Sequence, residues 1–131
     1  MRTLSASDIA HCAIGVDGAV LDPGMTCDRY WPESAFVDRY PTLAAIVILE
    51  VNPLPDLDER PQQGPRRPWR TIIRWLSRGA TPANDCVTVV VYHLARAGVV
   101  VPRYVTTPRA LYRFLQGDRH ARRTIRLAGR Q

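Results

Sequence analysis

Short apolar runs separated by turn residues dominate the first half of the chain. Residues 11–16 (His-Cys-Ala-Ile-Gly-Val) and 19–22 (Ala-Val-Leu-Asp) flank the pair Asp17-Gly18. An Asp-Gly pair between two such runs is a strong signal for a two-residue turn, because both central positions of that turn need a positive φ. The pattern predicts a hairpin in which Val16 pairs with Ala19, so that the numbers of paired residues sum to 35.

Three further segments complete this half. Residues 44–51 form a largely β-branched run that is typical of a buried central strand. Trp31-Pro32-Glu33-Ser34 opens a predicted short helix that reaches Tyr40. The stretch from Asn52 to Pro68 contains five prolines. We interpret residues 52–67 as a connector.

Helical spacing marks the second half of the chain. Residues 68–78 hold four apolar side chains at i, i+3, i+4 and i+7, namely Trp69, Ile72, Ile73 and Leu76. This stripe predicts a helix whose Trp69 packs in the core, while Trp75 falls off the stripe and could edge a groove.

Two more helices follow. The first is predicted from an N-cap at Asn84 or Asp85 to Gly98, although residues 87–91 also have strand propensity. The second begins at Thr107-Pro108 and ends at Gly117. The whole pattern predicts an α+β fold, in which a small antiparallel sheet packs against about three helices on one side.

Length and composition bound the class of protein. The 131 residues fit a single domain, 1–131, with strands in 1–51, the connector, helices in 68–116 and a basic tail in 117–131. The content of 46% hydrophobic and 23% charged residues is that of a soluble globular protein and excludes a disordered chain. The longest apolar run, 43–49, is too short to span a membrane. The polar N-terminus predicts no signal peptide and therefore a cytoplasmic protein.

Charge is distributed unevenly along the chain. Residues 1–65 carry four Arg and ten acidic residues, a net charge of −6, whereas residues 66–131 carry fourteen Arg and two acidic residues, a net charge of +12. The basic half could bind nucleic acid. Alternatively, the two halves neutralise each other when the chain folds.

Cysteine and histidine limit the metal chemistry. The chain has three of each and lacks both Cys-x-x-Cys and His-x-x-x-His, so we expect no metal site and no cofactor. An odd number of cysteines also argues against a disulfide framework and for a reducing compartment.

Cys86 is the candidate nucleophile. It follows Asn84-Asp85 in the first turn of a predicted helix, where free N–H groups and the helix dipole stabilise a thiolate. The same N–H groups can bind the oxyanion that forms when a thiolate attacks a carbonyl. The alternative is a small buried apolar residue, which is the commoner role of a free cysteine.

A cysteine nucleophile needs a base, and His11 is the best candidate. His93 lies seven residues after Cys86, roughly 10 Å along the helix, which is too far for an ion pair. His120 lies among arginines, and we expect it to be solvated. In the predicted hairpin, Asp22 faces Ala13 and is therefore diagonal to His11 on the same face, while Cys12 points to the other face.

This order of elements resembles the circularly permuted NlpC/P60, papain-like cysteine hydrolases. Residues 11–23 and 84–90 match the family's His–acid hairpin followed by a helix that begins at Cys, and residues 106–115 resemble the ending of small phage-encoded members. The resemblance implies Cys86 as nucleophile, His11 as general base and acid, and Asp22 as the acid that orients the base. Many members carry Ser after the Cys and Glu as the third residue, where this chain has Val87 and Asp22.

We therefore expect a thiol hydrolase or acyltransferase that acts on an amide or ester bond in a peptide, peptidoglycan or acyl substrate. Two alternatives remain open. One is a catalytically silent virion or assembly component with the same fold, which would be virion-associated if phage-encoded. The other is an Arg-rich module that binds nucleic acid through its helices. For Trp31, the alternatives are a residue lining the substrate cleft and a packed loop anchor.

Overall fold

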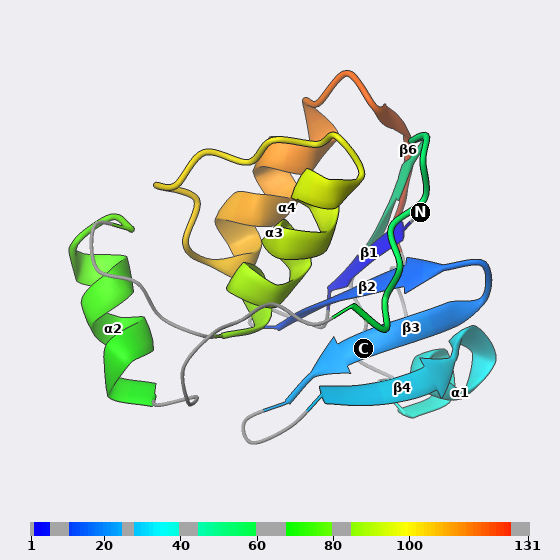
Figure 1. The fold of residues 1–131 in the computed structure, drawn as a ribbon, viewed down its shortest axis with the longest axis horizontal. Helices are drawn as coiled ribbons and strands as arrows, with labels where there is room; N and C mark the ends of the chain where they lie inside the picture. Colours follow the sequence, from blue (N-terminus) through cyan, green and yellow to red (C-terminus); the bar gives the residue numbers. More distant parts are fainter. Residues whose placement is uncertain are drawn as a thin grey trace.

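An antiparallel sheet of six strands, in the order β4-β3-β2-β1-β5-β6, forms the centre of the protein (Figure 1). The computed structural model describes residues 2–5, 11–24, 28–39, 45–59, 68–79 and 85–126. The strands are β1 (Arg2–Ser5), β2 (Cys12–Val16), β3 (Ala19–Pro23), β4 (Asp28–Pro32), β5 (Ala45–Leu49) and β6 (Ala121–Arg126). The α+β class with a small antiparallel sheet is as the sequence predicts.

The hairpin of β2 and β3 has the predicted register. Val16 pairs with Ala19 and Ile14 with Leu21, so paired numbers sum to 35. Asp17 and Gly18 have φ values of 50° and 82°, which is the left-handed conformation that a two-residue turn of this kind needs at both positions.

Two strands were not predicted. β1 has four residues, too few to show a pattern, yet it lies between β2 and β5 near the middle of the sheet. β4 is polar and largely exposed, and it pairs with β3 as an edge strand. Its final residue, Pro32, is tolerated there because an edge strand leaves one row of N–H groups unpaired by the sheet.

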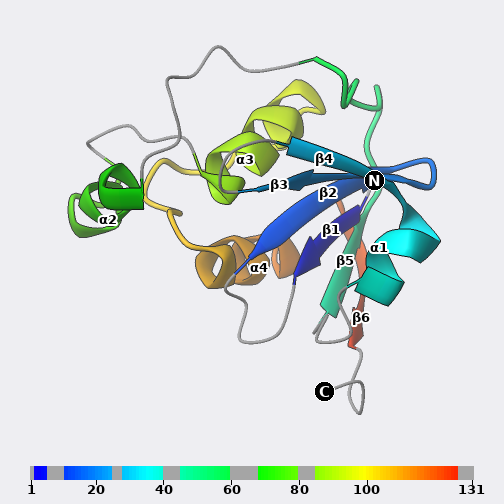
Figure 2. The same cartoon turned by 90° about the horizontal axis from the view of Figure 1, so that it is seen from below.

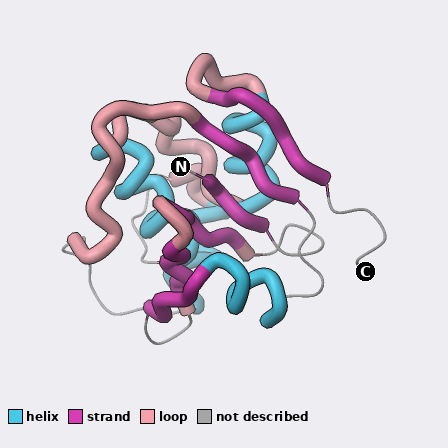
Figure 3. Tube along the Cα trace, turned by 90° about the vertical axis from the view of Figure 1, so that its right-hand side faces the viewer, coloured by secondary structure: helices cyan, strands magenta, loops and turns pink. Residues whose placement is uncertain are grey.

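The helices lie on both faces of the sheet, which corrects the prediction that they lie on one side. They are α1 (Glu33–Arg39), α2 (Pro68–Leu76), α3 (Cys86–Arg96) and α4 (Pro108–Gln116). Figure 2 shows α3 and α4 on one face and α1 on the opposite face. Figure 3 shows the same layers with the strands between the helices. α2 stands apart from the sheet in both cartoon views (Figures 1 and 2).

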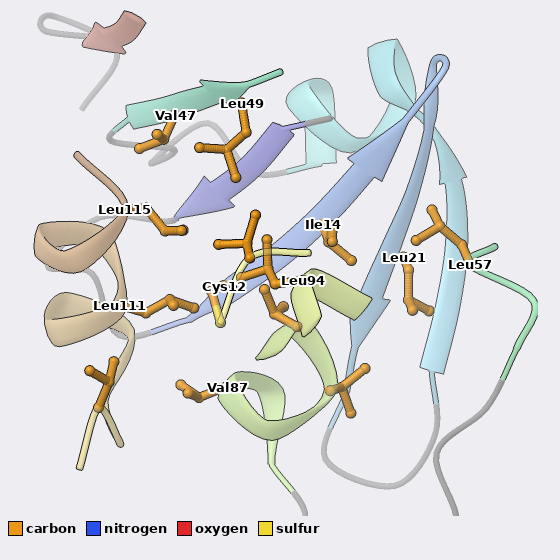
Figure 4. Packing of buried hydrophobic residues seen from close by; sticks show 14 residues of the cluster. Cys12, Ile14, Leu21, Val47, Leu49, Leu57, Val87, Leu94, Leu111 and Leu115 are labelled. Atoms are coloured by element: carbon orange, nitrogen blue, oxygen red, sulfur yellow. The ribbon is translucent and has the colours of Figure 1, made fainter. Parts of the chain in front are cut away.

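Alternation along the strands builds a separate core on each face. Cys12, Ile14 and Leu21 point to the face covered by α3 and α4. The larger core on this face also includes side chains of both helices, as Figure 4 shows for Val87, Leu94, Leu111 and Leu115. Ala13, Val20 and Ile46 point the other way and pack around Phe36 of α1.

The predicted basic tail is partly a strand. Residues 121–126 form β6, which pairs with β5 along the edge of the sheet. Because β6 covers one side of β5, β5 lies inside the sheet but next to its edge strand rather than at its centre.

Two ion pairs join the acidic and basic halves of the chain. Arg122 Nε lies 2.5 Å from Glu50 Oε2, and Arg96 Nε lies 2.7 Å from Glu59 Oε2. The Arg122 guanidinium holds the pKa of the Glu50 carboxyl below its usual value. Both pairs are largely exposed, so each stabilises the fold only weakly. No helix within the described residues is long and apolar enough to cross a bilayer.

His93 in α3 is buried without a hydrogen-bond partner for either ring nitrogen among the described residues. Burial lowers the pKa of its imidazole, against the opposing charges of nearby acidic groups. The charged groups that act on it are Glu59, Asp28, Asp56 and Arg96.

The lowered pKa of His93 predicts a loss of stability in acid. The unfolded chain binds the proton more readily than the folded chain, so the free energy of unfolding should fall as pH drops through about 6.5, the ordinary imidazole pKa. Replacing His93 with Leu should flatten this part of the stability–pH curve, measured by urea unfolding between pH 7 and pH 5. A wild-type curve that is parallel to the variant's over this range would contradict the prediction.

Candidate active site

Cys86 is the first residue of α3, as predicted. Asp85 is the N-cap: its side chain accepts a hydrogen bond from the Thr88 N–H at 2.9 Å, and Thr88 Oγ1 accepts one from the Asp85 N–H at 2.8 Å. This reciprocal capping box fixes where the helix starts. The Val89 N–H donates a backbone hydrogen bond to the Asp85 carbonyl. Cys86 thus lies half-buried at the positive end of the helix.

His11 and Asp22 form a close pair at the end of the hairpin. His11 Nε2 lies 2.5 Å from Asp22 Oδ1. The Asp22 side chain is only 4% exposed, whereas that of His11 is 27% exposed. The diagonal contact that the hairpin register predicted is therefore present.

Trp31 completes the surroundings of Asp22. Its indole Nε1–H donates to Asp22 Oδ2 at 3.3 Å, so both carboxylate oxygens have a partner. Trp31 lies on β4 opposite Val20, two residues after Arg29, which is the cross-strand partner of Asp22. Trp31 and Asp22 therefore lie on the same face of the sheet. This role of Trp31 was not predicted, because it depends on β4, which the sequence pattern does not indicate.

The three predicted site residues come together in the structure. Cys86 and His11 are close enough for each side chain to shift the pKa of the other. Cys86, His11 and Asp22 therefore form a continuous chain of contacts from α3 to β3.

The electrostatics favour an ion pair between His11 and Cys86. Burial disfavours the charged imidazole, but hydrogen bonds to Asp22 and Cys86 outweigh it and raise the pKa of His11 to about 9. A hydrogen bond from Cys12, and then the bond and charge of His11, lower the pKa of Cys86 to about 5 despite its burial. Between these two values the pair is a thiolate and an imidazolium.

Cys12 also belongs to the site, although it was not predicted as a site residue. Its buried thiol interacts with that of Cys86, and this interaction raises the pKa of Cys12 and lowers that of Cys86. The Cys12 side chain points toward the face of the sheet that α3 and α4 cover. His11 precedes β2 rather than lying within it, so alternation does not prevent both neighbours from reaching Cys86.

Two side chains attach α2 to the rest of the protein. Arg74 and Trp75 bind Asp85, the N-cap of α3, and Thr106, which precedes the N-cap of α4. The Arg74 guanidinium donates to both oxygens of Asp85, at 2.9 to 3.1 Å, and to the Thr106 carbonyl at 2.7 Å. Trp75 Nε1–H donates to the same carbonyl at 3.0 Å. α2 is therefore anchored to the residue that caps the helix of Cys86.

The other two histidines lie outside this group of contacts. His93 is in the core, as described above. His120 Nδ1 lies 2.7 Å from Asp118 Oδ2, and its side chain is half-buried rather than solvated as expected. Within the described ranges, no three His, Cys, Asp or Glu side chains are grouped so that they could hold a metal ion.

Comparison of the chain with protein-family models, with curated proteins and with solved structures gave no match.

Removing the thiol of Cys12 should weaken the thiolate of Cys86. In Cys12→Ala the S–H donor is lost, and alkylation of Cys86 by iodoacetamide at about pH 5 should slow by at least about sevenfold, because a hydrogen bond to a charged group contributes about 1.5–3 kcal/mol. Cys12→Ser is the matched control, since it keeps a hydroxyl donor at the same position and should slow the reaction less. Equal rates in all three proteins would show that Cys12 does not stabilise the thiolate.

Proposed function

We propose that the protein is a thiol hydrolase or acyltransferase that cleaves an amide or ester bond with Cys86 as nucleophile. The observation that carries this proposal is that Asp22 binds the His11 ring, while His11 and Cys86 interact so that the imidazole pKa is raised and the thiol pKa is lowered. A base within hydrogen-bond reach of the nucleophile, oriented by a third group, is the arrangement that covalent catalysis by cysteine requires.

In the first half-reaction, the Cys86 thiolate attacks the substrate carbonyl and forms a C–S bond, while the carbonyl electrons move onto oxygen. N–H groups at the start of α3 stabilise that oxyanion. The His11 imidazolium then donates a proton to the leaving amine or alkoxide as the C–N or C–O bond breaks. The product is an acyl-enzyme with a neutral His11.

In the second half-reaction, His11 takes a proton from water, or from another nucleophile in an acyltransferase. The activated oxygen attacks the thioester carbonyl, and the C–S bond breaks to restore the thiolate and imidazolium. Asp22 keeps the ring oriented and stabilises its charged form through both steps, and Trp31 holds Asp22 in place.

We further propose that the chain has the permuted arrangement of the NlpC/P60 papain-like hydrolases. Support comes from the order of the elements: the histidine precedes a hairpin, the acid ends the second strand of that hairpin, and the cysteine begins a helix later in the chain. Peptides, peptidoglycan and acyl esters are the substrate classes that this assignment suggests.

The test is capture of the acyl-enzyme. The wild-type protein, incubated with activated esters and with peptide amides, should gain the mass of the acyl group on the tryptic peptide that contains Cys86. Cys86→Ala should form no adduct, and His11→Ala should form it much more slowly. His120→Ala, whose side chain is paired with Asp118, is the control variant and should behave as wild type.

Two outcomes would overturn the proposal. Turnover that persists in Cys86→Ala would exclude Cys86 as nucleophile. A reactive Cys86 thiolate that forms no acyl adduct with any ester or amide would favour the silent assembly component instead.

A further inference from the structure

Helix α2 presents its apolar face to solvent, which corrects the prediction that Trp69 packs in the core. The stripe consists of Trp69, Ile72, Ile73 and Leu76, all of which are exposed. Trp69 is 51% exposed and Leu76 81% exposed, whereas Arg74 on the other side of the helix is only 6% exposed. An amphipathic helix of a globular protein normally turns its apolar face toward the core and its polar face toward solvent.

The hydrogen bonds of α2 explain its orientation. Arg74 binds Asp85 and the Thr106 carbonyl, and Trp75 binds the same carbonyl, so the helix is attached to the protein through its polar side. Turning the stripe inward would break these bonds and leave the charge of Asp85, which is largely buried, without its partner. The apolar face is therefore held outward by specific contacts.

Positive charge surrounds this apolar face. Within the described residues 68–79, three are Arg and none is acidic, and one of the three, Arg74, is paired with Asp85. Arg70, whose guanidinium carbon lies 5.3 Å from the centre of the Trp69 ring, and Arg78 are exposed at the two ends of the helix. Arg103 is also exposed, and its carbonyl lies against Gly79, just beyond the helix.

This combination of charge and apolar surface selects among possible partners. A second copy of the chain would bring two groups of arginines together, and like charges oppose such an interface. A nucleic acid would pair with the arginines but leave the apolar stripe in water. An anionic bilayer surface satisfies both, because apolar side chains enter the acyl boundary while arginines remain among the headgroups.

The dimensions of α2 fit an orientation in the plane of the membrane. Nine residues give a helix of about 13 Å, far too short to span a bilayer but long enough to lie along its surface. Tryptophan is also favoured at the boundary between acyl chains and headgroups. Tyr104, exposed next to Arg103, adds a second aromatic group of this kind on the neighbouring segment.

We propose that the α2 patch, defined as Trp69, Ile72, Ile73, Leu76, Arg70 and Arg78, docks the protein on a membrane surface rich in anionic lipid. Because α2 is bonded to Asp85, the residue before Cys86, docking places the start of α3 close to the bilayer. The proposal does not depend on catalysis, since the patch and its attachment lie outside the Cys86–His11–Asp22 contacts.

The test is co-sedimentation of the full chain with vesicles. The protein should bind vesicles of equal parts phosphatidylcholine and phosphatidylglycerol, and binding should weaken as salt is raised. The double variant Ile72→Ser/Leu76→Ser should bind at least about tenfold more weakly, because two apolar side chains no longer enter the bilayer. Arg70→Gln and Arg78→Gln should each weaken binding about fivefold.

Matched controls lie elsewhere on the surface. Leu54→Ser removes an exposed apolar side chain from the 50–59 segment, and Arg123→Gln removes an exposed arginine from β6. Both should bind as wild type does, and all variants should show wild-type circular dichroism. Cys86→Ala should also bind normally, which separates docking from the proposed reaction.

Several results would overturn the proposal. These are no sedimentation with anionic vesicles, equal binding to pure phosphatidylcholine vesicles, and equal losses in the control variants. A dimer in analytical ultracentrifugation that Ile72→Ser/Leu76→Ser dissociates would assign the patch to a second copy instead. Binding of RNA or DNA that the same double variant abolishes would assign it to nucleic acid.

Discussion

Replacing His11 with Ala is expected to reduce turnover by about 10²–10⁴-fold, the usual contribution of a general acid and base. The substitution also removes the charge and hydrogen bond through which His11 helps to hold the pKa of Cys86 near 5. At about pH 6, alkylation of Cys86 should therefore slow about tenfold. The rate of iodoacetamide modification, followed by mass spectrometry of the Cys86 peptide, measures this second effect independently of any substrate.

The pH profile of the wild-type protein gives the same prediction a second form. Turnover should follow a bell with limbs near pH 5 and pH 9, the values to which the interaction of Cys86 and His11 shifts their pKa values. Asp22→Asn removes the charge that supports the imidazolium, so it should move the alkaline limb to lower pH. Because the limbs report a coupled pair, they belong to the ion pair as a whole rather than to either residue.

His120→Ala is the matched control for His11. His120 is half-buried and paired with a carboxylate, Asp118, but it lies outside the contacts of Cys86. Its replacement should leave both the alkylation rate and the pH profile unchanged. Unchanged alkylation in His11→Ala would instead show that the thiolate does not depend on His11, and the proposed ion pair would be wrong.

Asp85→Ala is expected to lower the free energy of unfolding by about 3–5 kcal/mol, because it leaves the buried guanidinium of Arg74 without its partner and removes the cap of α3. For a domain of ordinary stability this is a large fraction of the total. Urea unfolding followed by circular dichroism measures the change.

Two further variants separate the charge from the cap. Asp85→Asn keeps a good N-cap but removes the negative charge, so it should destabilise the protein less than Asp85→Ala does. Combining Asp85→Asn with Arg74→Leu removes both charges and should recover part of the loss, since neither ion is then buried alone. A double variant as unstable as the sum of the single ones would show that the two side chains do not interact.

Local sequence patterns were sufficient to predict those features that depend on residues close together along the chain. The Asp17-Gly18 turn fixes the register of β2 and β3, and from that register follows the contact between His11 and Asp22. The caps Asp85 and Thr107 mark the starts of α3 and α4. These features were predictable because each depends on a turn or on one helical end.

Local sequence patterns were insufficient to predict features that depend on contacts between segments far apart along the chain. β1 and β4 owe their strand structure to pairing with neighbours rather than to their own composition, and the contact of Trp31 with Asp22 follows from β4. The contact of Cys12 with Cys86 depends on how α3 packs against β2. The predicted orientation of α2 was wrong, because periodicity identifies an apolar face but does not say which side of the helix is attached to the rest of the protein.

The sequence by itself determined the hairpin, the helix ends and the identity of the three candidate site residues, because these follow from turn geometry, capping and side-chain alternation. Only the tertiary structure decided that His11 and Cys86 are in contact, since they come from segments 75 residues apart along the chain. It also decided the outward face of α2, because the long-range bonds of Arg74 and Trp75 hold the helix by its polar side and override the burial that its apolar stripe would otherwise favour.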